Sequence, residues 1–438
     1  MNLDTAFLKR MQELLSEEYD DFIACYTQPP CKGVRLNSIK CSEEILKKSL
    51  PFSITPSGYS TLSYFADTTQ LGSLSAYHAG MFYAQEPSAS SVVTVLAPKP
   101  GEKVLDLCAA PGGKSTQVAA LLQGKGLLWS NEFVKKRANI LMSNMERMGV
   151  RNAVITALHP EKLCSTYAGY FDKVLVDAPC SGEGMFRKEK DAVADWSEEA
   201  VLACARRQQE ILASAAKAVK AGGVLVYSTC TFSVEENEGT IKTFLENHPE
   251  FEIEPINVPF GRPAINMSAV RIYPMDGGEG HFAARLRKTE DTKKSRVGVF
   301  KGKTENKLSN AFLENVCKSG LEEKVYQFGS KLYIIPQDFP DVTLVPVLRA
   351  GVELGEIKGS RIEPSHAFFM SRKPKELRQS LNFSDKDENL LSFLRGEEID
   401  CDKKGYTAVT VNGVVTGFGK ASNGRLKNHY PKGLRLLK

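Results

Sequence analysis

The 438-residue chain lacks the patterns that would place it in a membrane or give it a structural metal. No apolar run approaches the roughly 18 residues that a transmembrane helix needs. Its first residues have neither the basic segment nor the apolar stretch of a secretory signal peptide, so we expect a cytoplasmic protein. The ten cysteines include no C-x-x-C pair and the six histidines no H-x-x-x-H spacing, which argues against a zinc site and a disulfide framework.

Positive charge is concentrated at the C-terminal end of the chain. Residues 401–438 hold eight Lys or Arg against one acid, Asp402, and carry +7, which leaves −2 for residues 1–400. Apolar and polar residues alternate as in short strands over residues 407–411, 413–418 and 433–437. Asn412-Gly413 between the first two is typical of a hairpin turn. A run of charge is usually a solvated surface. A compact basic β-rich module nevertheless favours binding of RNA phosphates.

Apolar runs and helical segments alternate through the middle of the chain. The expected strands are residues 104–108, 126–131, 153–157, 173–176 and 224–227. The expected helices are residues 116–122, 135–148 and 198–219, the last ended by Gly222-Gly223. Strands alternating with helices in right-handed units predict a mostly parallel sheet and a Rossmann-like α/β core.

A glycine-containing turn, residues 108–114 (CAAPGGK), follows the first expected strand. Its small residues permit close approach of a ligand, and the start of the next helix offers free N–H groups. A Walker loop would need glycine at the position of Cys108, and the dinucleotide pattern G-x-G-x-x-G is absent, so we favour a loop that binds S-adenosylmethionine. Glu132 ends the next strand, where an acid grips ribose hydroxyls in doubly wound folds, although a solvated acid would look the same.

Two cysteines each follow directly on an expected strand. Cys180 follows residues 173–176 and Cys230 follows residues 224–227. Ligands of open α/β sheets bind outside the carboxyl ends of the strands, so these thiols are positioned for chemistry. Either cysteine alone would more often be a small buried residue. Beside the cofactor loop, the pair indicates an active site.

Three motifs in this order resemble the Nop/Sun-type RNA cytosine-C5 methyltransferases, most closely the bacterial RsmF-like branch that acts on 16S rRNA. They are residues 108–114, 177–186 (DAPCSGEGMF) and 228–232 (STCTF). Further segments similar to the family are residues 33–37 (GVRLN), 83–90 (YAQEPSAS), 271–274 (RIYP) and 280–282 (GHF). The resemblance covers about residues 30–290 closely and the remainder more loosely.

The resemblance implies methylation of cytosine carbon 5 through a covalent bond between Cys230 and carbon 6. A thiolate suits this step, because carbon 5 becomes nucleophilic only after a nucleophile has added at carbon 6. Cys180 is implied to assist removal of the carbon 5 proton and release of the product. Asp177, at the end of its strand, is positioned to hold the base edge near N3. Its alternative is an acid that caps a turn.

The resemblance also implies the residues that hold the cofactor and the RNA. The expected cofactor-binding residues are Cys108, Ala109, Ala110, Pro111, Gly112, Gly113, Lys114, Glu132, Arg137 and Asp177. The expected RNA contacts are Arg35, Asn37, Lys420, Arg425 and Lys427. The family often has an acidic residue after the third strand, where this chain has residues 157–161 (ALHPE), so either His159 replaces that contact or it is lost.

We expect four regions and a ribosomal substrate. An N-terminal α/β RNA-recognition element (1–75) begins with an amphipathic helix over residues 3–19 that packs on its own domain. A catalytic domain (76–290), a linker with a connecting domain (291–360) and a PUA-like basic RNA-binding domain (361–438) follow. The expected partner is ribosomal RNA or the small ribosomal subunit, with the target base flipped out of its stack. The methylated nucleotide and the oligomeric state are not encoded in any pattern we recognise.

Three alternatives stay open at this stage. The nearest is a tRNA cytosine-C5 methyltransferase with the same chemistry. An amino-group methyltransferase would be expected to carry Asn-Pro-Pro-Tyr or Asp-Pro-Pro-Tyr where this chain has residues 177–180 (DAPC). A non-catalytic ribosome-assembly factor would keep the fold for RNA binding alone, and a measurement of cofactor binding would distinguish it.

Overall fold

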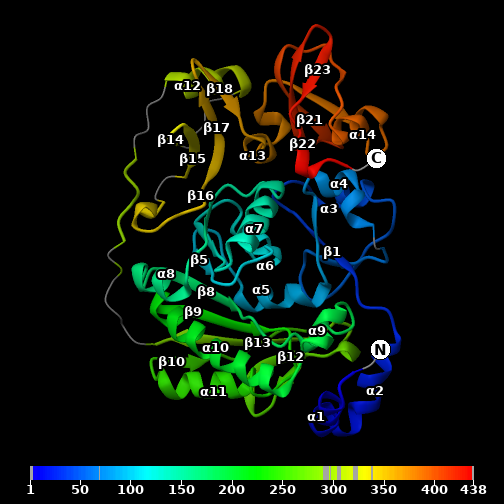
Figure 1. Cartoon of the computed structure of the whole chain (residues 1–438), viewed down its shortest axis with the longest axis vertical. Helices are drawn as coiled ribbons and strands as arrows, with labels where there is room; N and C mark the ends of the chain where they lie inside the picture. The colour runs from blue at the N-terminus through cyan, green and yellow to red at the C-terminus, as the bar shows by residue number, and fades with distance from the viewer. Residues whose placement is uncertain are drawn as a thin grey trace.

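The computed structural model describes residues 3–68, 70–289, 295, 297–302, 307–318, 324–336 and 339–436. Within these ranges, no helix has the length and apolar character needed to cross a bilayer. Nor does the described part of the chain bring together three or more His, Cys, Asp or Glu side chains that could hold a metal ion. In Figure 1 the C-terminal regions lie above the central α/β core, and the first helices lie at its lower edge.

The N-terminal region is a small antiparallel sheet with short helices around it. The sheet has the strand order β2-β3-β1-β4, and its strands are β1 (Gly33–Leu36), β2 (Thr55–Pro56), β3 (Ser63–Phe65) and β4 (Phe82–Ala84). Its helices are α1 (Thr5–Leu15), η1 (Ser16–Glu18), α2 (Tyr19–Ala24), η2 (Cys25–Thr27), α3 (Glu43–Lys48), η3 (Leu71–Ser73) and α4 (Ser75–His78). Because β4 pairs with β1, this region extends beyond the boundary that we expected at residue 75.

The first helix is shorter than expected, and it also packs against the α/β core. It spans Thr5–Leu15 rather than residues 3–19. Phe7 contacts Phe186 and Trp196 of this core, with ring centroids 5.0 and 5.8 Å apart. The helix packs on Phe22 of its own region, as expected, and its apolar side also covers aromatic side chains of the core.

The central α/β core is built on a mixed sheet of order β11-β12-β13-β9-β8-β5-β6-β7-β16, with β10 paired to β13. Its strands are β5 (Lys103–Asp106), β6 (Leu127–Asn131), β7 (Ala153–Thr156), β8 (Phe171–Asp177), β9 (Val219–Thr229), β10 (Phe251–Ile253), β11 (Arg262–Ala264), β12 (Met267–Ile272), β13 (His281–Lys288) and β16 (Arg349–Ala350). Neighbours among β5 to β9 are parallel, whereas β13 runs antiparallel to β9. The prediction of a Rossmann-like core is confirmed.

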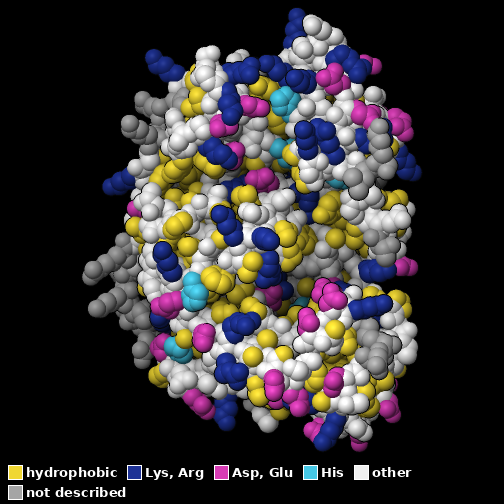
Figure 2. All heavy atoms as spheres, in the orientation of Figure 1, with side chains coloured by type: hydrophobic (Ala, Val, Ile, Leu, Met, Phe, Trp, Pro, Cys, Tyr) yellow, Lys and Arg dark blue, Asp and Glu magenta, His cyan; other side chains and the backbone are white. Residues whose placement is uncertain are grey.

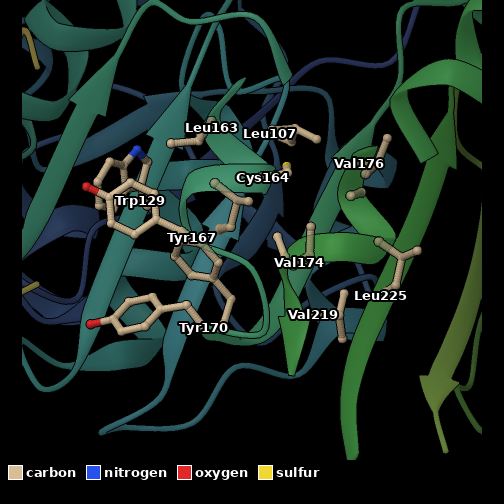
Figure 3. Packing of buried hydrophobic residues seen from close by; sticks show 14 of the residues in the cluster. Leu107, Trp129, Leu163, Cys164, Tyr167, Tyr170, Val174, Val176, Val219 and Leu225 are labelled. Carbon is tan, nitrogen blue, oxygen red and sulfur yellow. The ribbon is translucent and has the colours of Figure 1, made fainter. Parts of the chain in front are cut away.

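Helices cover both faces of this sheet, because each central strand alternates its buried side chains between them. The helices are η4 (Pro87–Ser90), α5 (Ser91–Leu96), α6 (Gly113–Leu122), α7 (Lys135–Arg147), α8 (Pro160–Thr166), η5 (Glu183–Met185), α9 (Lys190–Ala194), α10 (Glu198–Ala218), α11 (Glu238–Asn247) and η6 (Pro274–Asp276). On one face α6 and α7 bury Val118 and Leu141. On the other, α8 and α10 bury Leu163 and Leu212, and Figure 3 shows Tyr167, directly after α8, packed beside Trp129.

One predicted helix end is wrong. We expected Gly222-Gly223 to end the helix that begins at residue 198, but α10 ends at Ala218 and both glycines lie inside β9. The register of β9 against β8 shifts here, and a Cβ on Gly223 would lie 2.8 Å from the carbonyl oxygen of Lys220. The glycines thus serve an irregular strand start rather than a helix cap.

The connecting region contributes a second antiparallel sheet of order β14-β15-β17-β18. Its elements are α12 (Lys307–Val316), β14 (Lys324–Phe328), β15 (Lys331–Ile335), η7 (Val342–Leu344), β17 (Val352–Lys358), β18 (Arg361–Pro364), α13 (His366–Met370) and η8 (Pro374–Glu376). Strands β14 and β15 form an antiparallel hairpin in this region. The boundary expected after residue 360 falls in the turn of the β17–β18 hairpin, so the hairpin keeps both sides of it together.

The C-terminal region is a further sheet of order β19-β21-β22-β23-β20, in agreement with a PUA-like β-rich domain. Its elements are β19 (Ser380–Phe383), α14 (Glu388–Arg395), β20 (Ile399–Asp400), β21 (Gly405–Val411), β22 (Val414–Ser422), β23 (Arg425–Asn428) and η9 (Lys432–Leu434). The predicted hairpin is present, since Val411 pairs with Val414 across Asn412-Gly413, which both have positive φ. The strand expected at residues 433–437 is not found in the described part of this segment. Residues Lys432–Leu434 form the short helix η9 instead, so this prediction is wrong.

Candidate active site

A cavity of about 930 Å³ lies at the carboxyl ends of the parallel strands. Its wall is formed by one side of α10 and by the loops that follow β5, β6, β7, β8 and β9. The lining residues are Leu107, Cys108, Ala110, Glu132, Phe133, Val134, Arg137, His159, Pro160, Glu161, Asp177, Ala178, Pro179, Cys180, Arg207, Glu210, Ile211, Ala213, Ser214 and Cys230. This is the edge of the sheet at which α/β folds bind their ligands.

The CAAPGGK segment runs from β5 into α6 as a loop along one side of this cavity. Cys108 and Ala110 lie in the cavity wall, whereas the side chain of Lys114 turns toward β8. The N–H of Ala109 donates to the carbonyl of Asn131, which ties the loop to the end of β6. Gly112 has φ +112°, a conformation that residues with a Cβ rarely adopt, and it lets the loop turn into the helix.

The ends of β6 and β7 form a second part of the wall. Glu132 is buried, and its carboxylate lies 3.2 Å from the guanidinium of Arg137, which also donates to the carbonyl of Ala110. The side chain of Phe133 is 61% exposed and faces the ring of His159 edge-on, with centroids 5.5 Å apart. An acidic group therefore lies next to an exposed aromatic surface.

The two cysteines meet in the same cavity. The Sγ atoms of Cys180 and Cys230 are 3.3 Å apart, and the N–H of Cys230 points at the sulfur of Cys180 from 3.4 Å. The hydrogen bond between the thiols, together with burial, raises the pKa of Cys180 well above its ordinary value. Cys180 is therefore held in its protonated form, with its sulfur within hydrogen-bond distance of the Cys230 sulfur.

Asp177 occupies the end of β8 between these thiols and the loop. One carboxylate oxygen accepts from Lys114 Nζ at 2.7 Å and the other from Ser228 Oγ at 2.7 Å. Burial alone would lower the pKa of Lys114, but the charge of Asp177 outweighs it and the pKa is raised. Lys114 therefore stays protonated and keeps the carboxylate of Asp177 in one orientation.

The cavity fits S-adenosylmethionine by the chemistry of its wall. Glu132 offers a carboxylate of the kind that accepts hydrogen bonds from ribose hydroxyls. Phe133 exposes an aromatic surface against which a planar base can pack. The volume lies at the upper end of the range for pockets that hold small molecules, which leaves room for more than the cofactor.

Two of the residues expected to touch RNA are inside the protein. Arg35 is fully buried, and its guanidinium donates to Gln85 Oε1 and to Thr116 Oγ1 in α6. Asn37 is also fully buried and donates to the carbonyls of Gly80 and Met148. The expectation of RNA contact is corrected for both, because they brace the N-terminal sheet against the core.

The three C-terminal candidates lie on the surface of the C-terminal hairpin. Lys420 and Lys427 are exposed and directly opposite each other on β22 and β23. Arg425 is exposed as well and pairs with Asp400. Figure 2 shows Lys and Arg side chains over the upper part of the molecule, where this domain lies in Figure 1.

Sequence reasoning missed several residues of the site. Phe133, Arg207 and Glu210 line the cavity, and the buried carboxylates of Glu183 and Glu236 contact the loops that carry the thiols. Phe133 follows a strand end and could have been found from that position. Glu183 lies within the motif of residues 177–186, although no role was assigned to it, whereas no local pattern marks Arg207, Glu210 or Glu236.

Models of known families match four consecutive parts of the chain. Residues 3–87 match the N-terminal domain of 16S rRNA methyltransferase RsmF, and residues 93–287 match 16S rRNA methyltransferase RsmB/F. Residues 311–371 match the first C-terminal domain of RsmF rRNA methyltransferase, and residues 380–436 match the methyltransferase RsmF PUA domain.

Known proteins agree with these matches. The chain is 32% identical to ribosomal RNA small subunit methyltransferase F of Aliivibrio salmonicida, over 99% of this chain and 97% of that one. It is also 32% identical to the protein of the same name from Klebsiella pneumoniae, over 98% and 96%.

Solved structures show the same fold. A methyltransferase homolog from Pyrococcus horikoshii is 28% identical, with a TM-score of 0.57, over 65% of this chain and 95% of that one. NSun6 from Pyrococcus horikoshii, solved with the S-adenosylmethionine analogue SFG, is 24% identical, with a TM-score of 0.60, over 66% and 99%. With its four regions matched in order and nearly its whole length aligned, the chain belongs to the RsmF branch of the RsmB/F family of 16S rRNA methyltransferases.

Proposed function

We propose that this protein transfers a methyl group from S-adenosylmethionine to carbon 5 of a cytosine in 16S rRNA. The observation that carries the proposal is the 3.3 Å approach of the Cys180 and Cys230 sulfurs in a cavity that also contains the CAAPGGK loop. Binding of RNA or cofactor alone would require neither thiol. The names of the curated relatives support 16S rRNA as the substrate.

In the first step the thiolate of Cys230 adds to carbon 6 of the flipped cytosine. The new S–C6 bond forms as the electron pair of the C5–C6 double bond moves into the ring, which makes carbon 5 nucleophilic. N3 takes up a proton from solvent as the adduct forms, and Asp177 accepts a hydrogen bond from this N3–H in the orientation imposed by Lys114 and Ser228. Bound S-adenosylmethionine supplies an electrophilic methyl group on its sulfonium sulfur.

In the second step Cys180 removes the proton from carbon 5. The main cause of its raised pKa is its hydrogen bond to Cys230, and this cause disappears once the Cys230 sulfur is bonded to carbon. Cys180 can then lose its own proton to solvent and accept the carbon 5 proton, while the electron pair of the C5–H bond forms the C5–C6 double bond and the pair of the breaking S–C6 bond returns to Cys230. The N3 proton leaves to solvent, so the cycle releases one proton and restores the thiol pair.

Methyl transfer to purified RNA tests this function. We expect the protein to convert one or more cytosines of 16S rRNA, as naked RNA or in the small subunit, into bases that resist bisulfite conversion. The same assay is run with tRNA. Modification of tRNA alone would favour the tRNA alternative, and cofactor-free RNA binding without modification would favour an assembly factor.

Replacement of Glu132 by glutamine should weaken binding of S-adenosylmethionine by about 10-fold or more, since a hydrogen bond to a charged acceptor contributes roughly 1.5–3 kcal/mol. Calorimetry measures the Kd directly. Glu102→Gln, at the opposite end of β5, is the matched control and should bind as the parent does. Equal affinities of all three proteins would exclude Glu132 as a cofactor contact.

Reversal of charge on the C-terminal hairpin should weaken RNA binding. In Lys420→Glu/Lys427→Glu we expect the slope of log affinity against log salt to become shallower by roughly 1 to 2, because about two phosphate contacts are lost. Filter binding over a salt series measures the slope. Lys99→Glu/Lys125→Glu changes the same charge at the amino ends of β5 and β6, away from the cavity. Identical slopes for the two double variants would contradict RNA binding at the hairpin.

A further inference from the structure

A buried carboxylate from the Cys230 side holds the loop that carries Cys180. Glu236 lies six residues after Cys230 and is fully buried. It accepts from the N–H of Ser181 at 3.1 Å and from Gln208 Nε2 at 2.7 Å. The same Gln208 nitrogen donates to the carbonyl of Pro179 at 3.0 Å. Together, Glu236 and Gln208 contact the backbone on both sides of Cys180.

A second buried carboxylate makes the reverse connection. Glu183 lies three residues after Cys180 and is fully buried as well. One of its oxygens accepts from the N–H of Phe232 at 2.8 Å and from Thr231 Oγ1 at 2.7 Å. The other accepts from Ser233 Oγ at 2.7 Å and from Trp196 Nε1 at 2.9 Å. Glu183 therefore holds the segment that begins directly after Cys230.

Further hydrogen bonds connect the loop that carries Cys180 to the loop that carries Cys230. The hydroxyls of Ser181 and Thr231 lie 2.8 Å apart, and the N–H of Gly184 donates to the carbonyl of Cys230 at 2.9 Å. Gly184 has no room for a side chain, because a Cβ would lie 2.8 Å from the carbonyl of Gly280. Burying a carboxylate is costly unless hydrogen bonds satisfy it, and here every such bond to the backbone fixes one of the thiol loops.

We propose that Glu183 and the Glu236–Gln208 pair are positioning residues that set the two sulfurs separately, Glu183 for Cys230 and Glu236 with Gln208 for Cys180. This inference rests on the proposed two-thiol reaction. Reaction rates fall steeply when a reacting atom moves by about 1 Å, so loosening one loop should slow the step that its own sulfur performs. Formation of the RNA adduct depends on Cys230, and its decay depends on Cys180.

The Cys180 side is tested with Gln208→Met, which removes the bridge between Glu236 and Pro179 at similar volume. In single-turnover reactions with 16S rRNA we expect adduct formation near the parent rate and adduct decay slower by about 10-fold, so that covalent complex accumulates on denaturing gels. Gln209→Met is the control, since Gln209 is the next residue of α10 and bonds to the carbonyl of Thr240 instead. Glu236→Met serves as the second variant if Gln208→Met fails to fold.

The Cys230 side is tested with Glu183→Gln. An amide nitrogen cannot accept a hydrogen bond, so either Phe232 N–H or Trp196 Nε1 loses its acceptor whichever way the amide is turned. We expect adduct formation to slow by about 10-fold or more with no accumulation of complex. Glu254→Gln is the control, because Glu254 is a carboxylate of the core that pairs with Arg285 and Arg287, away from both thiol loops.

Cys180→Ala is measured in parallel to separate the two levels of inference. If Cys180→Ala traps no adduct, the proposed reaction itself fails. If it traps adduct while Gln208→Met and Glu183→Gln behave like their controls, only the positioning roles are wrong. If adduct formation and adduct decay slow equally in both variants, the positioning roles are also wrong, because general loosening of the fold would give that result.

Discussion

Replacement of Cys230 by alanine is expected to abolish methyl transfer to 16S rRNA, with a loss of roughly 10⁴-fold or more, as removal of an attacking nucleophile generally causes. Without the sulfur no bond forms at carbon 6, and carbon 5 stays a poor nucleophile. The Kd for S-adenosylmethionine should change by no more than about twofold, because the cofactor wall is made by other residues. Incorporation of labelled methyl groups and calorimetry measure the two effects.

Cys204→Ala is the matched control for this variant. Cys204 is another partly exposed free thiol, located on α10, and it is not among the residues that line the cavity. It should keep parent activity. Residual activity above about 1% in Cys230→Ala would show that another group attacks the base.

Replacement of Cys180 by alanine is expected to trap the covalent complex with RNA rather than to prevent its formation. Cys230 can still add to the base and carbon 5 can still take the methyl group, but the sulfur that removes the carbon 5 proton is gone. The S–C6 bond then persists, so protein accumulates on the RNA through a covalent link while turnover falls by about 100-fold or more. A slowly migrating band on denaturing gels, sensitive to nuclease, measures this complex.

The double variant Cys180→Ala/Cys230→Ala identifies the linked atom. It should form no covalent complex, since the attacking sulfur is absent. A complex that persists in the double variant would place the link elsewhere. Near-normal turnover in Cys180→Ala without any adduct would contradict the assignment of separate roles to the two thiols.

Local patterns were sufficient for the parts of the fold that depend on short-range chemistry. The strand at β5, the glycine turn into α6 and the Asn412-Gly413 hairpin all appear where the residues predict them. These elements follow from side-chain periodicity and from backbone angles that glycine or asparagine permits. The end of α10 failed for the converse reason, because pairing with β8 drew Gly222-Gly223 into a strand.

Contacts with the core decided two features of the N-terminal region. Arg35 and the first helix both look like surface features in the sequence, the one cationic and the other amphipathic. In the structure Arg35 bonds to α6 and the helix packs on Phe186 and Trp196. Which surface an element covers depends on contacts between distant segments, and neither charge nor amphipathicity specifies them.

By itself the sequence determined the α/β core, the glycine-containing turn after β5 and the presence of a thiol after each of two strands, because each of these depends on neighbouring residues. Only the tertiary structure decided that the two thiols lie 3.3 Å apart and that Glu183 and Glu236 each hold the loop of the other thiol. The physical reason is that β8 and β9 are adjacent in the sheet. Their pairing brings together loops about 50 residues apart, and burial of the carboxylates then favours the arrangement in which every charged oxygen has a donor.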